Sequence, residues 1–274
     1  MAQAETRSER WSVLLALLAE RRRLDVDEVA AELGVSAATV RRDFAALADE
    51  QLVTRVHGGV VATSVAYQLP ARYRQAGRPG VGPGVKERIA AAVAELLPRS
   101  GIVGLNGGTT CTAVARELGR RETPGELTLV TNALNIAAEM VLRPQLRCLC
   151  LGGMARPESY EVTGALAISV MEQLWLNVAV LGVNGLSAAG GATCRHEDEA
   201  GISALMARRA DRVVVAAEGG KVGRTAFARI CAPAAIHALV TDDSADEREL
   251  EHFAAAGTQI VRVAADREVA DAGS

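Results

Sequence analysis

The chain has 274 residues, of which 49% are hydrophobic and 23% are charged, a globular composition that excludes wholesale disorder. Its formal net charge of −3 excludes a protein that binds nucleic acid through bulk positive charge. The first sixty residues do not alter this picture, since they carry eight arginines against ten acids. Any contact with DNA therefore has to come from a local arrangement of charge.

The N-terminus has only a short apolar run, from Val13 to Leu18, and no cleavage-site pattern. It predicts neither a signal peptide nor a membrane anchor. The five cysteines are odd in number and form no Cys-x-x-Cys pair, which favours buried reduced thiols over a disulfide framework or a metal site. We therefore expect a soluble cytoplasmic protein with no membrane partner, no metal and no cofactor. The cysteines are Cys111, Cys148, Cys150, Cys194 and Cys231.

Composition divides the chain into three segments and a tail. Residues 7–61 combine short helical patterns with VTRVHGGVV, which predicts two short strands. Residues 62–85 contain GRPGVGPG, whose glycines and prolines suit a linker. Residues 86–265 alternate strands with helices, and residues 266–274 form the tail. The predicted fold is a mainly α winged helix-turn-helix domain followed by an α/β domain.

Two helices separated by a tight turn are predicted near the start of the first segment. Asp25 is suited to cap the first helix, with Glu28 completing a capping box. Gly34 is suited to end it in the left-handed conformation, and Ser36 then caps the second helix. Helices joined by so short a turn must cross sharply, which is helix-turn-helix geometry.

The second helix is expected to have two distinct faces. Val40, Phe44 and Leu47 recur at helical spacing and form its core stripe. Arg42 lies roughly opposite that stripe and Arg41 lies to its side. For an arbitrary helix, two such arginines are ordinary solvated charges.

Three local features favour DNA over solvent as the partner of these arginines. The helix is followed by a candidate β-wing, Val53 to Val61, and that wing carries Arg55 and His57 beside two glycines. Small alanines around the arginines would allow close docking. The adjacent charges, the wing and the small residues together predict a nucleic-acid interface.

The run DVDEVAAELGVSAATVRRDFAALADEQLVTRVHGG, residues 25–59, resembles the DNA-binding module of the DeoR family of bacterial transcriptional regulators, within a match of about fifty residues. The Arg-Arg-Asp helix and the His-Gly-Gly turn carry the resemblance. Asp43 is expected to orient a neighbouring arginine, and Phe44 replaces the family's usual leucine. The resemblance implies double-stranded operator DNA as partner, with contacts from Ser36, Thr39, Arg41, Arg42, Arg55, His57, Gly58 and Gly59.

The third segment predicts a mostly parallel sheet covered by helices on both faces, because its strands are apolar runs flanked by helical patterns. Ligands of such sheets bind outside the carboxyl ends of the strands. Strands are expected at 102–106, 127–131, 146–151, 178–182, 212–217, 236–241 and 259–264, and helices at 86–97, 110–118, 134–142, 164–175, 197–210 and 246–256.

A Gly-Gly-Thr-Thr loop joins the first of these strands to its helix. Backbone amides at a helix N-terminus, together with two threonine hydroxyls, make a natural phosphate cradle. A plain tight turn would use the same residues equally well. Further Gly, Thr and Asn clusters at neighbouring strand ends favour the cradle.

These clusters resemble the effector domain of the same family, over nearly all of 86–265. The resemblance implies the fold shared by ribose-5-phosphate isomerase and the coenzyme A transferases, and a phosphorylated sugar or related metabolite as ligand. Lys221 is the favoured anion contact, since Lys86 is the only other lysine. The implied effector-binding residues are Asn106, Gly108, Thr109, Thr110, Thr131, Asn132, Gly152, Gly153, Asn184, Glu199 and Lys221.

The sequence departs from the family pattern within this set. Asn106 and Asn184 stand where the family commonly has aspartates, and Glu218-Gly219-Gly220-Lys221 replaces an Asp-Ser-Ser-Lys run. Amides carry no charge and donate as well as accept hydrogen bonds. We therefore expect a less negative pocket and a different sugar or a more anionic ligand.

The main hypothesis is a DNA-binding repressor of a sugar catabolic operon, released by that metabolite and acting as a homodimer or homotetramer. The alternatives are a sugar-phosphate isomerase or coenzyme A transferase of the same fold, and a pure oligomerisation scaffold. An isomerase needs a carboxylate as general base. The loop after strand 178–182 offers Asn184 and Ser187 instead, with Glu199 the only acid near it, which disfavours the isomerase. A transferase needs a nucleophilic glutamate, for which Glu218 is a weak candidate.

Overall fold

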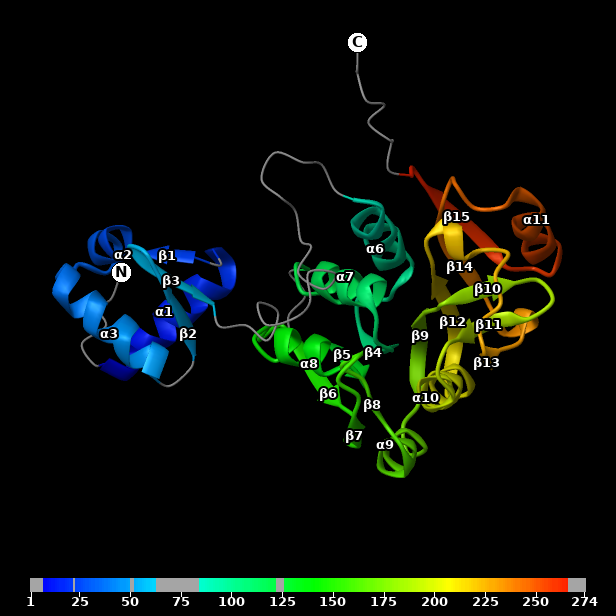
Figure 1. Cartoon of the computed structure of the whole chain (residues 1–274), viewed down its shortest axis with the longest axis horizontal. Helices are drawn as coiled ribbons and strands as arrows, with labels where there is room; N and C mark the ends of the chain where they lie inside the picture. Colours follow the sequence, from blue (N-terminus) through cyan, green and yellow to red (C-terminus); the bar gives the residue numbers. More distant parts are fainter. Residues whose placement is uncertain (1–6, 22, 50–51, 63–83, 122–125, 266–274) are drawn as a thin grey trace, which may run out of the picture. The chain divides into compact units, whose positions relative to one another are not determined.

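The computed structural model describes residues 7–21, 23–49, 52–62, 84–121 and 126–265. The chain divides into two compact units, Met1–Arg74 and Gln75–Ser274 (Figure 1). The predicted linker lies almost wholly outside the described residues, since Ala62 ends a strand and the next helix begins at Val85. The predicted tail, 266–274, also lies outside them. The predicted domain boundaries stay predictions.

The described part of the first unit packs helices α1, α2 and α3 against a small antiparallel sheet. Strand order is β1-β3-β2, so the wing hairpin β2–β3 is extended by a strand that precedes α2. Leu14, Val29, Leu47 and Val60 are almost completely buried where these elements meet. The elements are α1 (Arg7–Arg21), β1 (Arg23–Asp25), α2 (Val26–Leu33), α3 (Ala37–Asp49), β2 (Val53–Val56) and β3 (Gly59–Ala62).

The second unit is built on a seven-stranded sheet in the order β15-β14-β12-β9-β4-β5-β6. Every neighbouring pair is parallel, so all the carboxyl ends of the strands lie on one edge. The strands are β4 (Gly101–Leu105), β5 (Leu127–Thr131), β6 (Leu146–Cys150), β9 (Leu176–Gly182), β12 (Ala210–Ala216), β14 (Ala238–Asp242) and β15 (Gln259–Val263).

Helices cover both faces of this sheet, as predicted. On one face Ile89, Val114 and Ile136 of α6, α7 and α8 are fully buried in one apolar cluster. On the other face Ile202 of α10 and Phe253 of α11 belong to a second cluster, which α9 joins. The helices are α6 (Val85–Leu96), α7 (Thr109–Leu118), α8 (Leu134–Met140), α9 (Ala165–Met171), α10 (Glu197–Arg208) and α11 (Glu247–Ala255).

The sequence did not predict the small sheets that decorate the carboxyl edge. An antiparallel sheet in the order β10-β11-β13 and the hairpin β7–β8 lie in segments that were assigned to no element. The predicted helix 164–175 is also shorter, since α9 ends at Met171. The added elements are β7 (Met154–Ala155), β8 (Val162–Thr163), β10 (Gly185–Ser187), β11 (Gly191–Cys194) and β13 (Ala228–Cys231), with short 3-10 helices η1 (Gly219–Lys221) and η2 (Pro233–Ala235).

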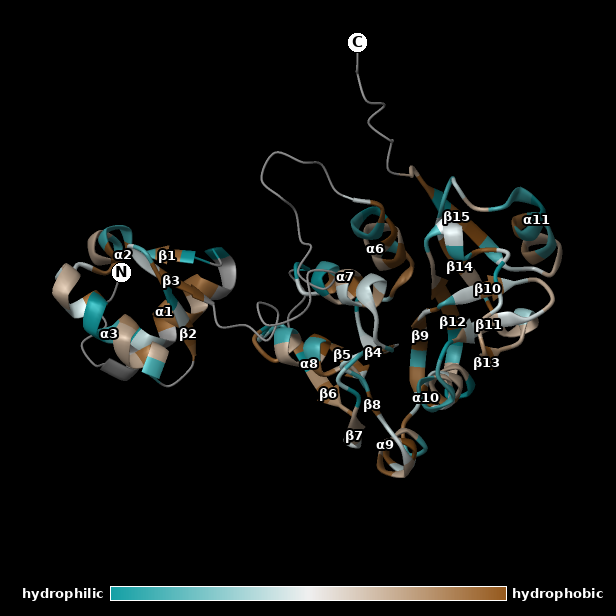
Figure 2. Cartoon of the chain, in the orientation of Figure 1, coloured by the Kyte–Doolittle hydropathy of each residue, from teal (hydrophilic) through white to brown (hydrophobic). Residues whose placement is uncertain are grey.

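Hydropathy separates the interior of each unit from its surface. Strands β9 and β12 in the middle of the large sheet are mainly brown, whereas the outlying helix α11 is mainly teal (Figure 2). This is the distribution expected when apolar burial drives folding. Among the described residues, no helix combines the length and the apolar character that crossing a bilayer requires.

Candidate functional site

The turn between α2 and α3 is fixed by the caps that the sequence predicts. Asp25 caps α2 by accepting a hydrogen bond from the Asp27 amide at 3.0 Å. Gly34 ends α2 with a φ of 65°, the left-handed conformation that glycine adopts most cheaply. Ser36 Oγ accepts from the Thr39 amide at 3.1 Å at the start of α3. The returning bond from Glu28 that would complete a capping box is not among the hydrogen bonds of the described residues.

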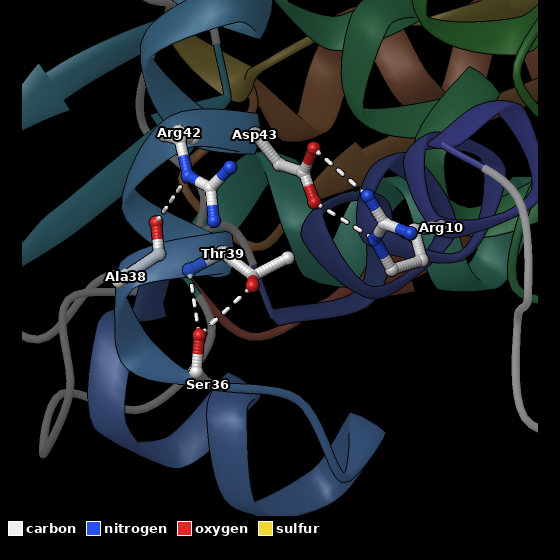
Figure 3. Close-up of polar contacts among 6 residues, drawn as sticks. All are labelled: Arg10, Ser36, Ala38, Thr39, Arg42 and Asp43. Atoms are coloured by element: carbon white, nitrogen blue, oxygen red, sulfur yellow. Dashed lines mark hydrogen bonds and ion pairs between the residues drawn. The ribbon is translucent and has the colours of Figure 1, made fainter.

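Helix α3 presents the two faces expected of it. Val40, Phe44 and Leu47 are at most 2% exposed, whereas Arg41 and Arg42 lie on the exposed side. The Arg42 Nε donates to the Ala38 carbonyl at 3.3 Å, so the guanidinium lies back along the helix (Figure 3). The hydroxyls of Ser36 and Thr39 are 2.8 Å apart at the N-terminal end of the same face.

A buried ion pair fixes α3 to α1. The Asp43 carboxylate is only 5% exposed, and it accepts from Arg10 Nε at 2.9 Å and Arg10 Nη2 at 3.3 Å (Figure 3). The arginine that Asp43 holds therefore comes from α1 and not from α3 itself. A fork of two charge-assisted bonds fixes both the distance and the rotation between two helices. The exposed arginines of α3 are thus presented on a helix whose rotation about its axis this ion pair restrains.

The wing is a tight hairpin whose turn is hydrogen-bonded to strand β1. His57 and Gly58 form the two-residue turn, and Arg23 of β1 donates to the His57 carbonyl at 3.2 Å. Arg55 and His57 are exposed. Gly59 is instead buried, and a Cβ there would overlap the backbone oxygen of Leu24. Packing against β1 is thus a sufficient reason for Gly59, while its predicted DNA contact stays a prediction.

In the second unit Asn106 joins two strand ends. Its Nδ2 donates to the Gly182 carbonyl at 2.9 Å and to Ser203 Oγ at 3.0 Å. Its Oδ1 accepts from the Gly182 amide at 2.8 Å and from the Cys111 thiol at 3.1 Å. Because the protein itself engages both ends of this amide, Asn106 holds β4 against β9. Asn106 therefore has a structural role, and its predicted contact with the ligand stays a prediction.

The predicted phosphate cradle lies where β4 passes into α7. Gly108 caps α7 with a φ of 102°, and a Cβ on Gly108 would meet nothing within 4 Å. Thr109 begins the helix, and the buried hydroxyl of Thr110 has no hydrogen-bond partner among the described residues. Open space above a helix N-terminus, with an unused hydroxyl beside it, suits an anion.

The next two strand ends contribute unequally to the site. Thr131 Oγ1 accepts from the Ala133 amide at 3.0 Å, which is a turn-forming bond. Asn132 is fully buried, and its Oδ1 accepts no hydrogen bond among the described residues. Gly152 faces open space, whereas a Cβ on Gly153 would lie 2.6 Å from the Thr163 carbonyl of β8. Gly152 therefore has room beside it for a ligand, and Asn132 keeps an unused acceptor in the interior.

Glu161 is a central residue that the sequence reasoning missed. Its carboxylate is 6% exposed, accepts from Asn132 Nδ2 at 2.9 Å and lies against Gly107 of the cradle loop. Burial raises the pKa of Glu161 to about 7, and the charge of Glu199 adds to the rise. Hydrogen bonds from Asn132 and the Gly107 backbone oppose it, as does Arg156. A lone acid within the otherwise uncharged run YEVTG was the available signal.

The structure adds one carboxylate, that of Glu161, to the Glu199 carboxylate that the sequence predicts in this region. Glu199 is also buried and pairs with Arg156 Nε at 3.0 Å, so Glu161 and Glu199 place two carboxylates near the cradle. The amides at 106 and 184 do not decide the charge of this region.

Asn184 follows β9, the neighbour of β4 in the middle of the sheet, and Lys221 follows β12, the next strand along. Lys221 borders a cavity of about 430 Å³, and its Nζ is 3.9 Å from Glu218 Oε1. Burial lowers the pKa of Lys221, while the carboxylate of Glu218 opposes the shift. Lys86, the only other lysine, binds the same carboxylate at 2.9 Å. Asn184 is exposed and accepts from the Arg195 amide at 3.0 Å.

These distances group the predicted effector residues into two clusters. One cluster joins Asn132 to Glu161 and to the cradle loop, with Glu199 beside it. The other joins Lys221 to Glu218 and Lys86 around the cavity. Within the described ranges, no three His, Cys, Asp or Glu side chains gather in a way that could hold a metal ion.

Comparison with known protein families matches both units. A DeoR-like helix-turn-helix domain matches residues 10–65, and a DeoR C terminal sensor domain matches residues 83–243. The HTH-type transcriptional regulator GlpR of Haloferax volcanii is 31% identical over 93% of this chain and 97% of its own length. The glycerol-3-phosphate regulon repressor of Escherichia coli is 27% identical over 86% of this chain and 90% of its own.

Among solved structures, a ribose 5-phosphate isomerase from Methanocaldococcus jannaschii aligns over 50% of this chain and 53% of its own. The sequences are 14% identical and the TM-score is 0.36. A likeness of this size carries no weight for function. The named sequence relatives are regulators.

The ion pair between α1 and α3 predicts a measurable contribution to stability. Asp43→Ala removes both hydrogen bonds between Arg10 and Asp43 and should lower the free energy of unfolding of the first unit by about 2 kcal/mol. The matched control is Glu32→Ala, which breaks an exposed pair with Arg21 and should cost under about 1 kcal/mol. With Trp175→Phe, Trp11 fluorescence follows this unit alone. Equal losses from the two variants would contradict the assigned role.

The raised pKa of Glu161 predicts that stability of the second unit falls as pH rises. Between the ordinary pKa of 4.5 and about 7, the folded chain holds a proton that the unfolded chain has released. The free energy of unfolding should therefore drop across this interval, by on the order of 3 kcal/mol from this group.

Glu161→Gln should flatten that slope, whereas Glu172→Gln at an exposed position should not. Urea unfolding of the full chain at several pH values measures the slope, with Trp11→Phe leaving Trp175 as the reporter. An unchanged slope in Glu161→Gln would show that Glu161 titrates normally.

Proposed function

Because the chain belongs to the DeoR family of transcriptional regulators, we propose that it represses a sugar-related operon and leaves its operator when a phosphorylated sugar or related metabolite binds the C-terminal sensor domain. The observation that carries the proposal is the presence of both family domains in one chain, with the DNA-binding domain before the sensor domain. The glycerol-3-phosphate regulon repressor, aligned over nearly its whole length, supports the same pairing of functions.

The DNA-binding half of the proposal rests on the exposed face of α3. Arg41 and Arg42 are exposed there, while the opposite face of the helix is buried and the Asp43–Arg10 pair fixes its rotation. Guanidinium groups bind guanine edges and phosphates through paired donors. We assign the major-groove contacts to Ser36, Thr39, Arg41 and Arg42, and the backbone contacts to Arg55, His57, Gly58 and Gly59.

The sensing half rests on the carboxyl edge of the large sheet. Gly108, Thr109 and Thr110 provide a helix N-terminus with open space above it and an unused hydroxyl. Lys221 adds a partly buried cation at the neighbouring cavity. An anion such as a phosphate would gain from both. We place the rest of the effector at Asn106, Thr131, Asn132, Gly152, Gly153, Asn184 and Glu199.

Operators of helix-turn-helix regulators commonly contain two half-sites related by symmetry. A protein that reads both half-sites must present two reading helices, so we propose that the chain acts as a homodimer or homotetramer. Sedimentation of the full chain with and without duplex measures this state, and a monomer in both conditions would contradict it.

Arg42→Ala should remove most binding to a specific duplex while leaving the fold intact. Loss of a bidentate base contact costs about 1–3 kcal/mol, which is roughly 10- to 100-fold in affinity. The duplex is first selected from a random pool by the full chain, and binding is then measured by fluorescence anisotropy. Arg120→Ala, at an exposed position in the other unit, is the control. Unchanged affinity in Arg42→Ala would rule out α3 as the recognition helix.

Lys221→Ala should keep DNA binding but abolish release by the effector, because the cation at the sensor cavity is lost. Release is measured on the selected duplex with a panel of sugar phosphates that includes glucose 6-phosphate and glycerol 3-phosphate. Arg248→Ala, an exposed position on α11, should release DNA like the parent chain. If Lys221→Ala also releases normally, Lys221 lies outside the sensor site.

A further inference from the structure

The Glu161 side chain occupies the first part of the predicted cradle. The chain on either side of it pairs with the segment after β5, since the Leu134 amide donates to the Tyr160 carbonyl at 2.8 Å and the Val162 amide donates to the Asn132 carbonyl at 2.7 Å. This pairing places the Glu161 carboxylate against Gly107, where a Cβ would overlap it. Backbone hydrogen bonds of the two residues that flank Glu161 therefore hold its backbone in position beside the site.

The hydrogen bonds around Asn132 and Glu161, the corner of the site beside Gly107, determine which of their polar atoms remain free to bind a ligand. Asn132 Nδ2, one of its donors, is already taken by Glu161. The Asn132 Oδ1 is fully buried and accepts no hydrogen bond from any described residue. A buried acceptor without a partner is costly unless a ligand or water satisfies it. Asn132 Nδ2 also donates to the Val162 carbonyl at 3.3 Å, so the capacity left at the Asn132–Glu161 pair consists of acceptors.

The charge of the corner agrees with its hydrogen bonding. Arg156 contacts Glu199 directly at 3.0 Å, and no ion pair to Glu161 is present among the described residues. Burial and the Glu199 charge hold the pKa of Glu161 near 7, so this carboxylate is mainly charged above neutral pH. Cys111 and Cys194, the thiols closest in its electrostatic surroundings, have pKa values raised to about 12 and about 11 by burial and so stay neutral.

We propose that Glu161, together with Asn132, is the specificity-determining pair of the sensor site, and that it selects effectors by the terminal group of the carbon chain that carries the phosphate. A hydroxyl or an ammonium group donates to these acceptors and is favoured. A carboxylate or a second phosphate offers no donor, meets a like charge and is rejected. The inference rests on the proposed function, because it requires a phosphorylated ligand in the cradle.

The test compares ligands that share a carbon skeleton and differ in one terminal group. Calorimetry with the full chain measures dissociation constants for sorbitol 6-phosphate against 6-phosphogluconate, and for glycerol 3-phosphate against 3-phosphoglycerate. The parent chain should prefer the hydroxyl-terminated member of a bound pair by about tenfold or more, the effect of one nearby like charge. Glu161→Gln should reduce this preference to within about threefold, and the exposed control Glu172→Gln should leave it unchanged.

The parent chain provides a second test that does not depend on the folding of the variant. Protonation of Glu161 removes its charge below neutral pH, so the preference within a pair should shrink between pH 8 and pH 6. Both members of a pair carry the same phosphate, so its titration cancels in the ratio of their dissociation constants. The carboxylates of the acid members stay ionised throughout this range.

The outcomes separate this inference from the proposed function. Binding of either pair with the same preference in Glu161→Gln and at both pH values overturns the specificity role alone. Failure of all four compounds to bind the parent chain, together with failure to release DNA, overturns the sensing function and this inference with it.

Discussion

A carboxylate removed from water must be given hydrogen-bond donors or must take up a proton, and each unit of this protein is organised around such a group. In the first unit Asp43 is buried and Arg10 satisfies it, which locks α3 against α1. In the second unit Glu161 is buried with only partial compensation, and burial raises its pKa to about 7. The first arrangement restrains one helix against another, and the second leaves a buried carboxylate that titrates near neutral pH.

The DNA-binding unit illustrates how a nearly neutral segment can present a local positive charge. The helix positions of Val40, Phe44 and Leu47 bury one face, so Arg41 and Arg42 must lie on the exposed side. Arg10 neutralises Asp43 within the core, which removes the one acid of α3 beside the arginines from the exposed face. The net charge of the segment therefore says little about the field that this helix presents.

Most of the fold could be predicted from the sequence because its signals are local. Caps at Asp25 and Ser36, the glycine at 34 and the helical spacing of apolar residues define the first unit. Apolar runs of strand length, alternating with helices, define the parallel sheet. The short strands β7, β8, β10 and β11 gave no such signal, because two to four residues are too few to show a period.

The site was less predictable because its chemistry depends on contacts between distant segments. Asn106 could be recognised as polar at a strand end, but not as the amide that fastens β4 to β9 across 76 residues. Glu161 lies 54 residues beyond Gly107 in sequence and still determines the charge of the cradle. The sequence predicts Glu199 as a site residue but not Glu161, which reaches the site only through the pairing of its segment with the one after β5. Such a pairing becomes visible only when the chain is folded.

The central claim is that one chain reads DNA with α3 and releases it when a phosphorylated ligand fills the sensor site. The most direct measurement is the affinity of the full chain for its selected duplex across a salt series, repeated with saturating ligand from the sugar-phosphate panel. We predict a linear fall of log affinity with log salt, from phosphate contacts, and a further drop in affinity on adding the active ligand. Specific binding that no member of the panel weakens would contradict the account.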